Sequence, residues 1–194
     1  MIDGTATGRR WRITFNAPAV LCFAALCLCA TILDQLTGGA ANRLAFSTYR
    51  SSPLNPLTYV RLFTYVLGHA GWDHLIGNMS YILLLGPLLE EKYGSRTIVE
   101  IIALTALATG LVNSLLFSNI ALCGASGVCF AFILLSSVTS LGEGEIPLTF
   151  ILVAVLFLGQ QVVDGIFVRD NISNLSHILG GIVGAGCGFA LSRR

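Results

Sequence analysis

The sequence predicts an all-α membrane protein with six transmembrane helices and a long interfacial first loop. Two features of composition support this prediction. Hydrophobic residues make up 55% of the 194 residues and charged residues only 11%, whereas a soluble domain carries about a quarter charged residues. Mean hydropathy is +0.80. The third observation is a series of six apolar stretches, each close to the roughly 20 residues that cross a hydrocarbon core.

Six helices are predicted, with a long loop after the first and turn-like breaks after the second, fourth and fifth. The helices lie at residues 17–36, 72–89, 97–117, 125–141, 146–163 and 175–191. We therefore divide the chain into an N-terminal tail (1–16), a six-helix membrane domain (17–191) and a C-terminal tail (192–194). The arginines before the first stretch also suit a cleaved signal peptide or a twin-arginine signal. The apolar run is longer than a usual signal sequence, which favours a retained helix.

The distribution of positive charge predicts that both termini are cytoplasmic. With the N-terminus inside, seven lysines and arginines lie in the cytoplasm and four outside, as the positive-inside rule favours. The compact size suggests a prokaryotic plasma membrane. The first loop, residues 37–71, is too interrupted to span the bilayer. We expect it to form an amphipathic element in the outer interface.

Composition excludes several other classes of function. A net charge of +1 gives no electrostatic reason to expect a nucleic-acid partner. The six cysteines lie in or beside apolar stretches and form neither a CxxC pair nor a Cys/His zinc spacing, so we interpret them as small buried hydrophobes. No metal ligand set and no cofactor motif is apparent in the sequence.

Four polar residues interrupt the apolar stretches at matching positions. His74 and Asn78 lie four residues apart at the start of the second stretch, Ser126 starts the fourth, and His177 starts the sixth. These three helices run in the same direction, so the four side chains are expected at one depth near the outer surface. Taken singly, each could serve only interhelical hydrogen bonding. Their matched depth instead favours a shared functional site.

These residue types suit nucleophilic catalysis. A serine needs a neighbouring base, and His177 is the candidate general base for Ser126. The oxyanion formed by attack on an amide needs donors, which His74, Asn78 and the backbone N–H of Ser126 would supply. Gly124 and Gly127 would leave room for backbone close to the substrate.

These motifs resemble those of the rhomboid family of intramembrane serine proteases over roughly residues 55–191. The family's H-x-x-x-N motif matches His74 and Asn78, and its G-x-S-G motif matches residues 124–127. Its sixth-helix motif is similar to the segment from Ser176 to Gly180, and a further family histidine is matched by His69. The resemblance implies a Ser–His dyad that cleaves single-pass membrane proteins near the outer end of their transmembrane helix, with the lipid bilayer as its surroundings.

Three departures from the family pattern are found. Where the family often has Trp-Arg before a Phe-Thr pair in the first loop, this chain has Val60-Arg61-Leu62. The residue that stacks on the catalytic histidine, commonly a tyrosine, is Phe130, which retains the ring and loses the hydroxyl. The position three after His74, often bulky in the family, is Gly77. The third departure concerns substrate entry rather than the dyad.

A glycine ridge is expected to bring the sixth helix close to the fourth. Gly180, Gly184 and Gly188 recur at four-residue spacing, which permits close helix contact. The alternative use of this ridge is a homodimer face, so a homo-oligomer remains possible on sequence grounds.

Two other classes of function compete with an enzyme. A catalytically silent rhomboid-like protein would bind membrane clients, but such a protein does not require both Ser126 and His177. A small transporter or channel would place its polar residues along a path near the midplane. The polar residues here are predicted at one outer depth instead, so an intramembrane serine endopeptidase is the favoured interpretation.

Overall fold

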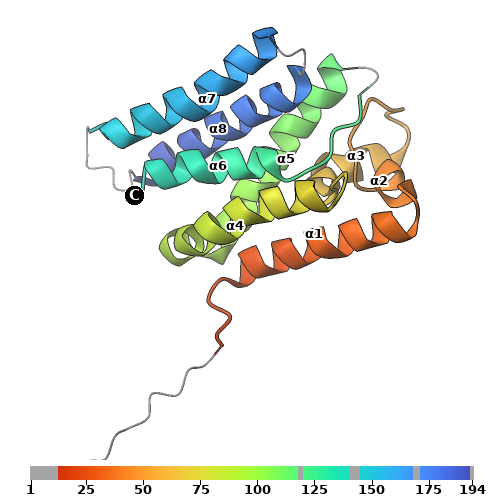
Figure 1. The fold of residues 1–194 in the computed structure, drawn as a ribbon, viewed down its shortest axis with the longest axis horizontal. Helices are drawn as coiled ribbons and strands as arrows, with labels where there is room; N and C mark the ends of the chain where they lie inside the picture. Colours follow the sequence, from red (N-terminus) through yellow and green to blue (C-terminus); the bar gives the residue numbers. More distant parts are fainter. Residues whose placement is uncertain (1–12, 118–119, 140–144, 168–170, 193–194) are drawn as a thin grey trace, which may run out of the picture.

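A computed structural model describes residues 13–117, 120–139, 145–167 and 171–192 of the chain. Six helices in this part of the chain match the six predicted stretches (Figure 1). They are α1 (Pro18–Leu36), α4 (Trp72–Tyr93), α5 (Ser95–Leu116), α6 (Ser126–Ser137), α7 (Leu148–Phe167) and α8 (Asn171–Ser192). The all-helical prediction is therefore confirmed, and the predicted tails fall largely outside the described residues.

Four boundaries of the predicted helices were wrong by four residues. Helix α7 ends at Phe167 rather than 163, and α8 starts at Asn171 rather than 175; the other two are the ends of α4 and α6. Helix α4 continues to Tyr93, four residues beyond the predicted end, and Pro87 lies within it. A single glycine, Gly94 (φ 82°), then separates it from α5, because glycine tolerates the left-handed backbone that ends a helix. Helix α6 ends at Ser137 rather than 141, and the chain turns at residues 138–139.

Within the described residues, three helices are long and apolar enough to cross a membrane by their own length and composition. They are α1, α5 and the Asn174–Ser192 part of α8. Helix α6 and the Leu148–Val163 part of α7 are apolar but shorter. Helix α4 is long but carries Asp73, His74 and Asn78 in its first two turns. The helices together expose many large apolar side chains, among them Leu84, Leu115 and Leu156 at 66–70% exposure, a surface suited to lipid.

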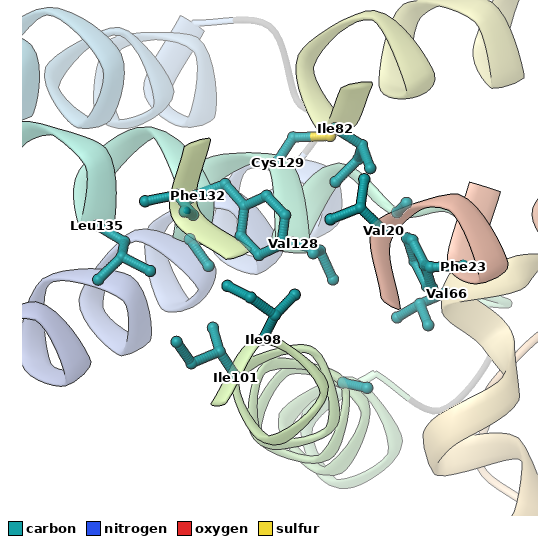
Figure 2. Packing of buried hydrophobic residues seen from close by; sticks show 14 of the residues in the cluster. Val20, Phe23, Val66, Ile82, Ile98, Ile101, Val128, Cys129, Phe132 and Leu135 are labelled. Carbon is teal, nitrogen blue, oxygen red and sulfur yellow. The ribbon is translucent and has the colours of Figure 1, made fainter. Parts of the chain in front are cut away.

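Helix α6 is the centre of the bundle. Figure 1 shows it between α4 and α8, with α1 outermost on one side and α7 on the other. A helix that is apolar all round is buried all round, and α6 is of this kind. Eight of its residues, from Gly127 to Leu135 with one exception, are buried. Figure 2 shows Phe132 of α6 packed among residues of α1, α4 and α5, including Val20, Ile82 and Ile98.

The first loop folds into short helices rather than one long element. It contains α2 (Ala40–Leu44), α3 (Pro56–Thr64) and the 3-10 turn η1 (Tyr65–Leu67). Asn55 caps α3 by accepting from the backbone N–H of Leu57. Helix α3 buries Leu62 against α5 and leaves Phe63 exposed. A short helix with apolar residues on its outer face fits the predicted interfacial role, whose position relative to a membrane stays a prediction.

The N-terminus of α1 is capped by a side chain from another helix. Its own N-cap residue, Ala17, has no side chain that can accept a hydrogen bond. Glu90 of α4 supplies the acceptors instead: its two carboxylate oxygens lie 2.9 Å from the backbone nitrogens of Ala19 and Val20. Ser95 donates to the same carboxylate at 2.6 Å. This buried anion at the positive end of α1 joins the first, second and third long helices.

Replacing Glu90 by alanine should destabilise the fold. The variant leaves two backbone N–H groups of α1 without their acceptor, so we expect a loss of about 2–4 kcal/mol in the free energy of unfolding. Reversible unfolding in detergent measures this. The matched control is Glu91→Ala at the exposed neighbouring position, which should change stability by less than about 0.5 kcal/mol. Equal losses in both variants would contradict the assigned cap.

Candidate active site

The loop that carries Ser126 is held by the first loop. Thr48 and Leu122 exchange two backbone hydrogen bonds at 2.9 Å, the single bridge of the described residues. Two residues further on, the N–H of Gly124 donates to the carbonyl of Tyr65 at 3.0 Å. These bonds determine where α6 begins, and Ser126 is its first residue.

His69 is a buried support for the same loop. Its Nδ1 lies 3.1 Å from the carbonyl oxygen of Leu67, which can only accept, so Nδ1 carries the hydrogen and Nε2 is free to accept. The N–H of Ala125 donates to that Nε2 at 3.5 Å. Burial, and secondarily a positive charge on His74, lower the pKa of His69 to about 4, although the Leu67 carbonyl acts in the opposite direction. His69 therefore acts as a neutral acceptor, consistent with the supporting role expected of it.

A second network holds the backbone of His69. Asp34, at the end of α1, accepts from both the backbone N–H and the side-chain amide of Asn42, at 2.8 and 2.9 Å. The same amide donates to the carbonyl of His69 at 2.9 Å. The buried carboxylate of Asp34 thus connects α1 through α2 to the start of α4.

His74 presents its Nε2 to the serine loop. The N–H of Ala70 donates to its Nδ1 at 3.3 Å, so the ring hydrogen is on Nε2. A Cβ at Gly124 would lie 2.7 Å from both Cε1 and Nε2 of this ring. Gly124 also has φ of 123°, where side chains are disfavoured. Glycine at this position is therefore required by the ring of His74, and its role in leaving room for the substrate stays a prediction.

The side-chain amide nitrogen of Asn78 is buried. The Sγ of Cys129 lies 3.4 Å from the backbone carbonyl oxygen of Asn78 and 3.7 Å from its Oδ1. The other end of the amide, Nδ2, is buried and donates to no described group. Buried donors are nearly always satisfied in folded proteins, and a functional site is one of the recognised exceptions.

The glycine ridge of α8 packs directly on the backbone of α6, as predicted. A Cβ at Gly180 would lie 2.1 Å from the carbonyl oxygen of Gly127, and a Cβ at Gly184 would lie 2.0 Å from that of Ala131. At Gly188 it would lie 2.0 Å from Val138. Gly127 in turn faces the carbonyl of Ser176. The ridge is thus used inside the chain, and a homo-oligomer stays a prediction.

This packing carries His177 to the first turns of α6. The ring of Phe130 stacks on the ring of His177 with centroids 4.3 Å apart and planes 5° apart, so the expected stacking survives the loss of the hydroxyl. Gln161 of α7 holds the ring edge, with its Oε1 2.6 Å from His177 Nδ1. Asn174, the residue one turn before His177, is buried in α8.

Gln161 is a site residue that was not predicted from the sequence. The sequence does contain an indication of its role, because Gln160 and Gln161 are adjacent polar residues in an otherwise apolar stretch. They were overlooked because they lie near the end of the fifth stretch, which runs in the opposite direction to the helices that carry the predicted site.

One cavity of about 300 Å³ brings these groups together. It is bounded by α4, α6, α7 and α8, and Gly77 forms part of its wall, where a Cβ would meet nothing within 4 Å. The predicted nucleophile, base and one oxyanion donor all line it. The lining residues are Gly77, Asn78, Tyr81, Ser126, Cys129, Phe130, Ile133, Phe157, Gln160, Gln161 and His177.

Comparison with known proteins points to one family. The sequence signature of the Rhomboid domain matches residues 56–194. The chain is 29% identical to Rhomboid protease GluP of Bacillus subtilis (strain 168) over 170 residues, which are 84% of this chain and 32% of that protein. It is 31% identical to Rhomboid-related protein 1 of Caenorhabditis elegans over 140 residues, 68% of this chain and 39% of that protein.

A mammalian protein is similar as well. Rhomboid-related protein 2 of Mus musculus is 28% identical over 158 residues, which are 71% of this chain and 52% of that protein. The chain therefore spans about a third to a half of the length of these curated relatives. The name of the Bacillus protein states a protease, whereas the names of the other two state no activity.

Adding one methyl group between α6 and α8 should destabilise the fold. In Gly184→Ala the new Cβ meets the backbone of Ala131, which has to shift, so we expect the free energy of unfolding to fall by about 1–3 kcal/mol. The control is Gly186→Ala on the open face of α8, where a Cβ meets nothing within 4 Å. That variant should be neutral or slightly stabilising. Unfolding in detergent distinguishes them, and equal behaviour would contradict the packing.

The neutral His69 should make the fold sensitive to acid. Its pKa of about 4 lies below the ordinary value of 6.5, so the unfolded chain binds the proton more tightly. The stability due to neutral His69 is complete above pH 6.5 and is lost as the pH falls from there towards 4. The loss should approach about 3 kcal/mol. Unfolding measured across this range should show a smaller slope in His69→Gln than in the original chain, and identical slopes would refute the assignment.

Proposed function

The chain belongs to the rhomboid family, and we propose that it is a serine-type intramembrane endopeptidase. Its substrates in this proposal are single-pass membrane proteins, cut near the outer end of their transmembrane helix. The observation that carries the proposal is the cavity that Ser126, His177 and Asn78 line together. The side-chain amide nitrogen of Asn78 is buried and donates no hydrogen bond to a described group. A nucleophile, a base and an unused donor are the three parts that acyl transfer requires.

The reaction would begin with proton transfer between helices. His177 accepts the proton of Ser126 Oγ as that oxygen attacks the scissile carbonyl carbon. The carbonyl π electrons move to oxygen, and the resulting oxyanion lies among the amide of Asn78, the Nε2–H of His74 and the backbone N–H of Ser126. The tautomer assigned to His74 supports its part, because only a protonated Nε2 can donate to an oxyanion.

Collapse of this intermediate would break the peptide bond. The C–N bond cleaves as His177 returns its proton to the leaving amine, and the acyl group stays on Ser126 as an ester. Water then attacks the ester with His177 again as the base, releasing the acid and restoring the serine. The dyad contains no acid, and no carboxylate is present among the described residues that line the cavity.

The membrane arrangement is part of the same proposal. All six helices, α1 and α4–α8, cross the bilayer with both termini in the cytoplasm, which puts the cavity near the outer surface. Helix α6 spans only about 18 Å at 1.5 Å per residue, but it is shielded from lipid by its neighbours. A helix substrate would unwind locally at the cavity, because helical carbonyls are engaged in hydrogen bonds.

Cleavage by the purified full chain in liposomes tests the proposal. With a single-pass membrane substrate we expect one cut near the outer boundary of its helix, located by mass spectrometry and unaffected by a chelator. Ser126→Ala and His177→Ala should abolish the cut, because each removes one member of the dyad. Asn78→Ala should lower kcat by about 10²–10³-fold, as loss of an oxyanion donor does.

The control is Ser137→Ala in the last turn of the same helix, which should retain full activity. Its hydroxyl bonds only to the carbonyl of Leu134 among the described groups. A chain that binds the substrate without cutting it would support a silent client-binding protein instead. Cleavage by Ser126→Ala would show that the nucleophile is assigned wrongly.

A further inference from the structure

Gln161 is a buried polar side chain in α7, a helix that exposes many of its apolar side chains. It is 8% exposed, whereas Val162, Val163 and Leu156 of the same helix are 50–66% exposed. Its neighbour Gln160 also lines the cavity but is exposed. An amide in an apolar span is costly unless it is bonded, and the bond that Gln161 makes is to His177.

The chemistry of this contact determines the tautomer of the base. The acceptor Gln161 Oε1 lies 2.6 Å from His177 Nδ1, and a carbonyl oxygen can only accept. The ring hydrogen must therefore be on Nδ1, and the lone pair of the neutral ring is on Nε2. Such a ring can take a proton through Nε2, which general-base catalysis at a serine requires.

The position of the ring is determined from three helices at once. Its backbone belongs to α8, its face is stacked on Phe130 of α6, and its Nδ1 is held by α7. Stacking determines the plane of the ring, but a half-turn about the Cβ–Cγ bond would keep that plane and reverse the direction in which Nδ1 points. The hydrogen bond from α7 removes that freedom.

We infer that Gln161 is the positioning residue of the active site, a neutral acceptor that holds His177 in the Nδ1–H tautomer with its edge towards Ser126. The inference deepens the proposed function and rests on it for its catalytic meaning. The assignment of the His177 tautomer does not depend on the proposed function. A neutral amide here orients the ring without adding a charge, in place of the carboxylate that serves this purpose in Ser–His–Asp triads.

The first test reads the tautomer directly. The chain has three histidines, so ¹⁵N-labelled imidazole signals of the full-length protein in detergent can be assigned by comparison with His177→Ala. At a pH where the ring is neutral, we expect Nδ1 of His177 protonated and Nε2 unprotonated. In Gln161→Met this preference should be lost, while Gln160→Met should retain it. A protonated Nε2 in the original chain, or no change in Gln161→Met, would overturn the inference.

The second test separates positioning from structural support. In Gln161→Met we expect kcat to fall about tenfold, the equivalent of one hydrogen bond, with KM changed less than about twofold. Rates are normalised to the fraction of folded protein, so a loss of stability alone would not change them. Gln35→Met, at an exposed glutamine of α1 that does not line the cavity, should match the original chain in both constants. A change confined to KM or to the folded fraction would overturn the positioning role.

The isosteric acid supplies a third readout. Gln161→Glu keeps an acceptor oxygen in place, so kcat on the plateau of the pH profile should recover to within about threefold of the original. The new negative charge favours the imidazolium, so the acidic limb of the kcat–pH profile should move up by about one pH unit. The inference would be overturned if the kcat–pH profile of Gln161→Glu had the same plateau and the same acidic limb as that of Gln161→Met.

These outcomes are distinguishable from failure of the proposed function. The nuclear magnetic resonance measurement needs no turnover and can be repeated in Ser126→Ala. If no substrate is cut but the tautomer depends on Gln161, the protease proposal fails and the positioning contact stands. If cleavage requires Ser126 but the tautomer of His177 does not change in Gln161→Met, the protease proposal stands and the positioning contact fails.

Discussion

The structure depends on the direct approach of two helix backbones, those of α6 and α8. The carbonyls of Gly127 and Ala131 occupy the space that side chains at Gly180 and Gly184 would need. Between two helices in lipid the hydrophobic effect contributes little, so close van der Waals packing has to supply the attraction. This approach sets the distance between the first turn of α6 and the second turn of α8, and the distance between Ser126 and His177 follows from it.

Burial of polar groups is the second constraint, and the chain meets it with bonds between distant segments. Glu90 caps a helix 70 residues away, Asp34 holds Asn42, and His69 accepts from the loop before Ser126. The Glu90 bonds hold the start of α1, and the Asp34 bonds hold the segment that follows its end. In a medium without water, such satisfied networks are what allow non-helical backbone to remain near an active site.

The candidate site departs from this pattern at the point where function is expected. The amide nitrogen of Asn78 is buried and donates to no described group, while its oxygen is engaged by Cys129. The same polar residues that build the site also lower the hydropathy of α4. Helix α6 is short for a bilayer, yet the surrounding helices keep it from lipid. Polarity is thus tolerated in α4, which holds His74 and Asn78, and shortness is tolerated in α6, which holds Ser126.

The sequence by itself determined the helical class, the six apolar stretches, the polar motifs and the family, because composition and local spacing carry these properties. It also indicated the contact of α8 with α6, since a glycine at every fourth position lies on one helix face. It did not predict the end of α6, which depends on how neighbouring helices enclose it.

Only the tertiary structure decided which side chains meet across helices. Glu90 at α1 and Gln161 at His177 are contacts between residues 70 and 16 positions apart, on helices whose rotation about their axes no local pattern specifies. The tautomers of His69, His74 and His177 follow from the partners that these rotations provide. Spacing along the chain can place a histidine at the right depth, but the hydrogen on its ring is assigned by the neighbour that the fold brings to it.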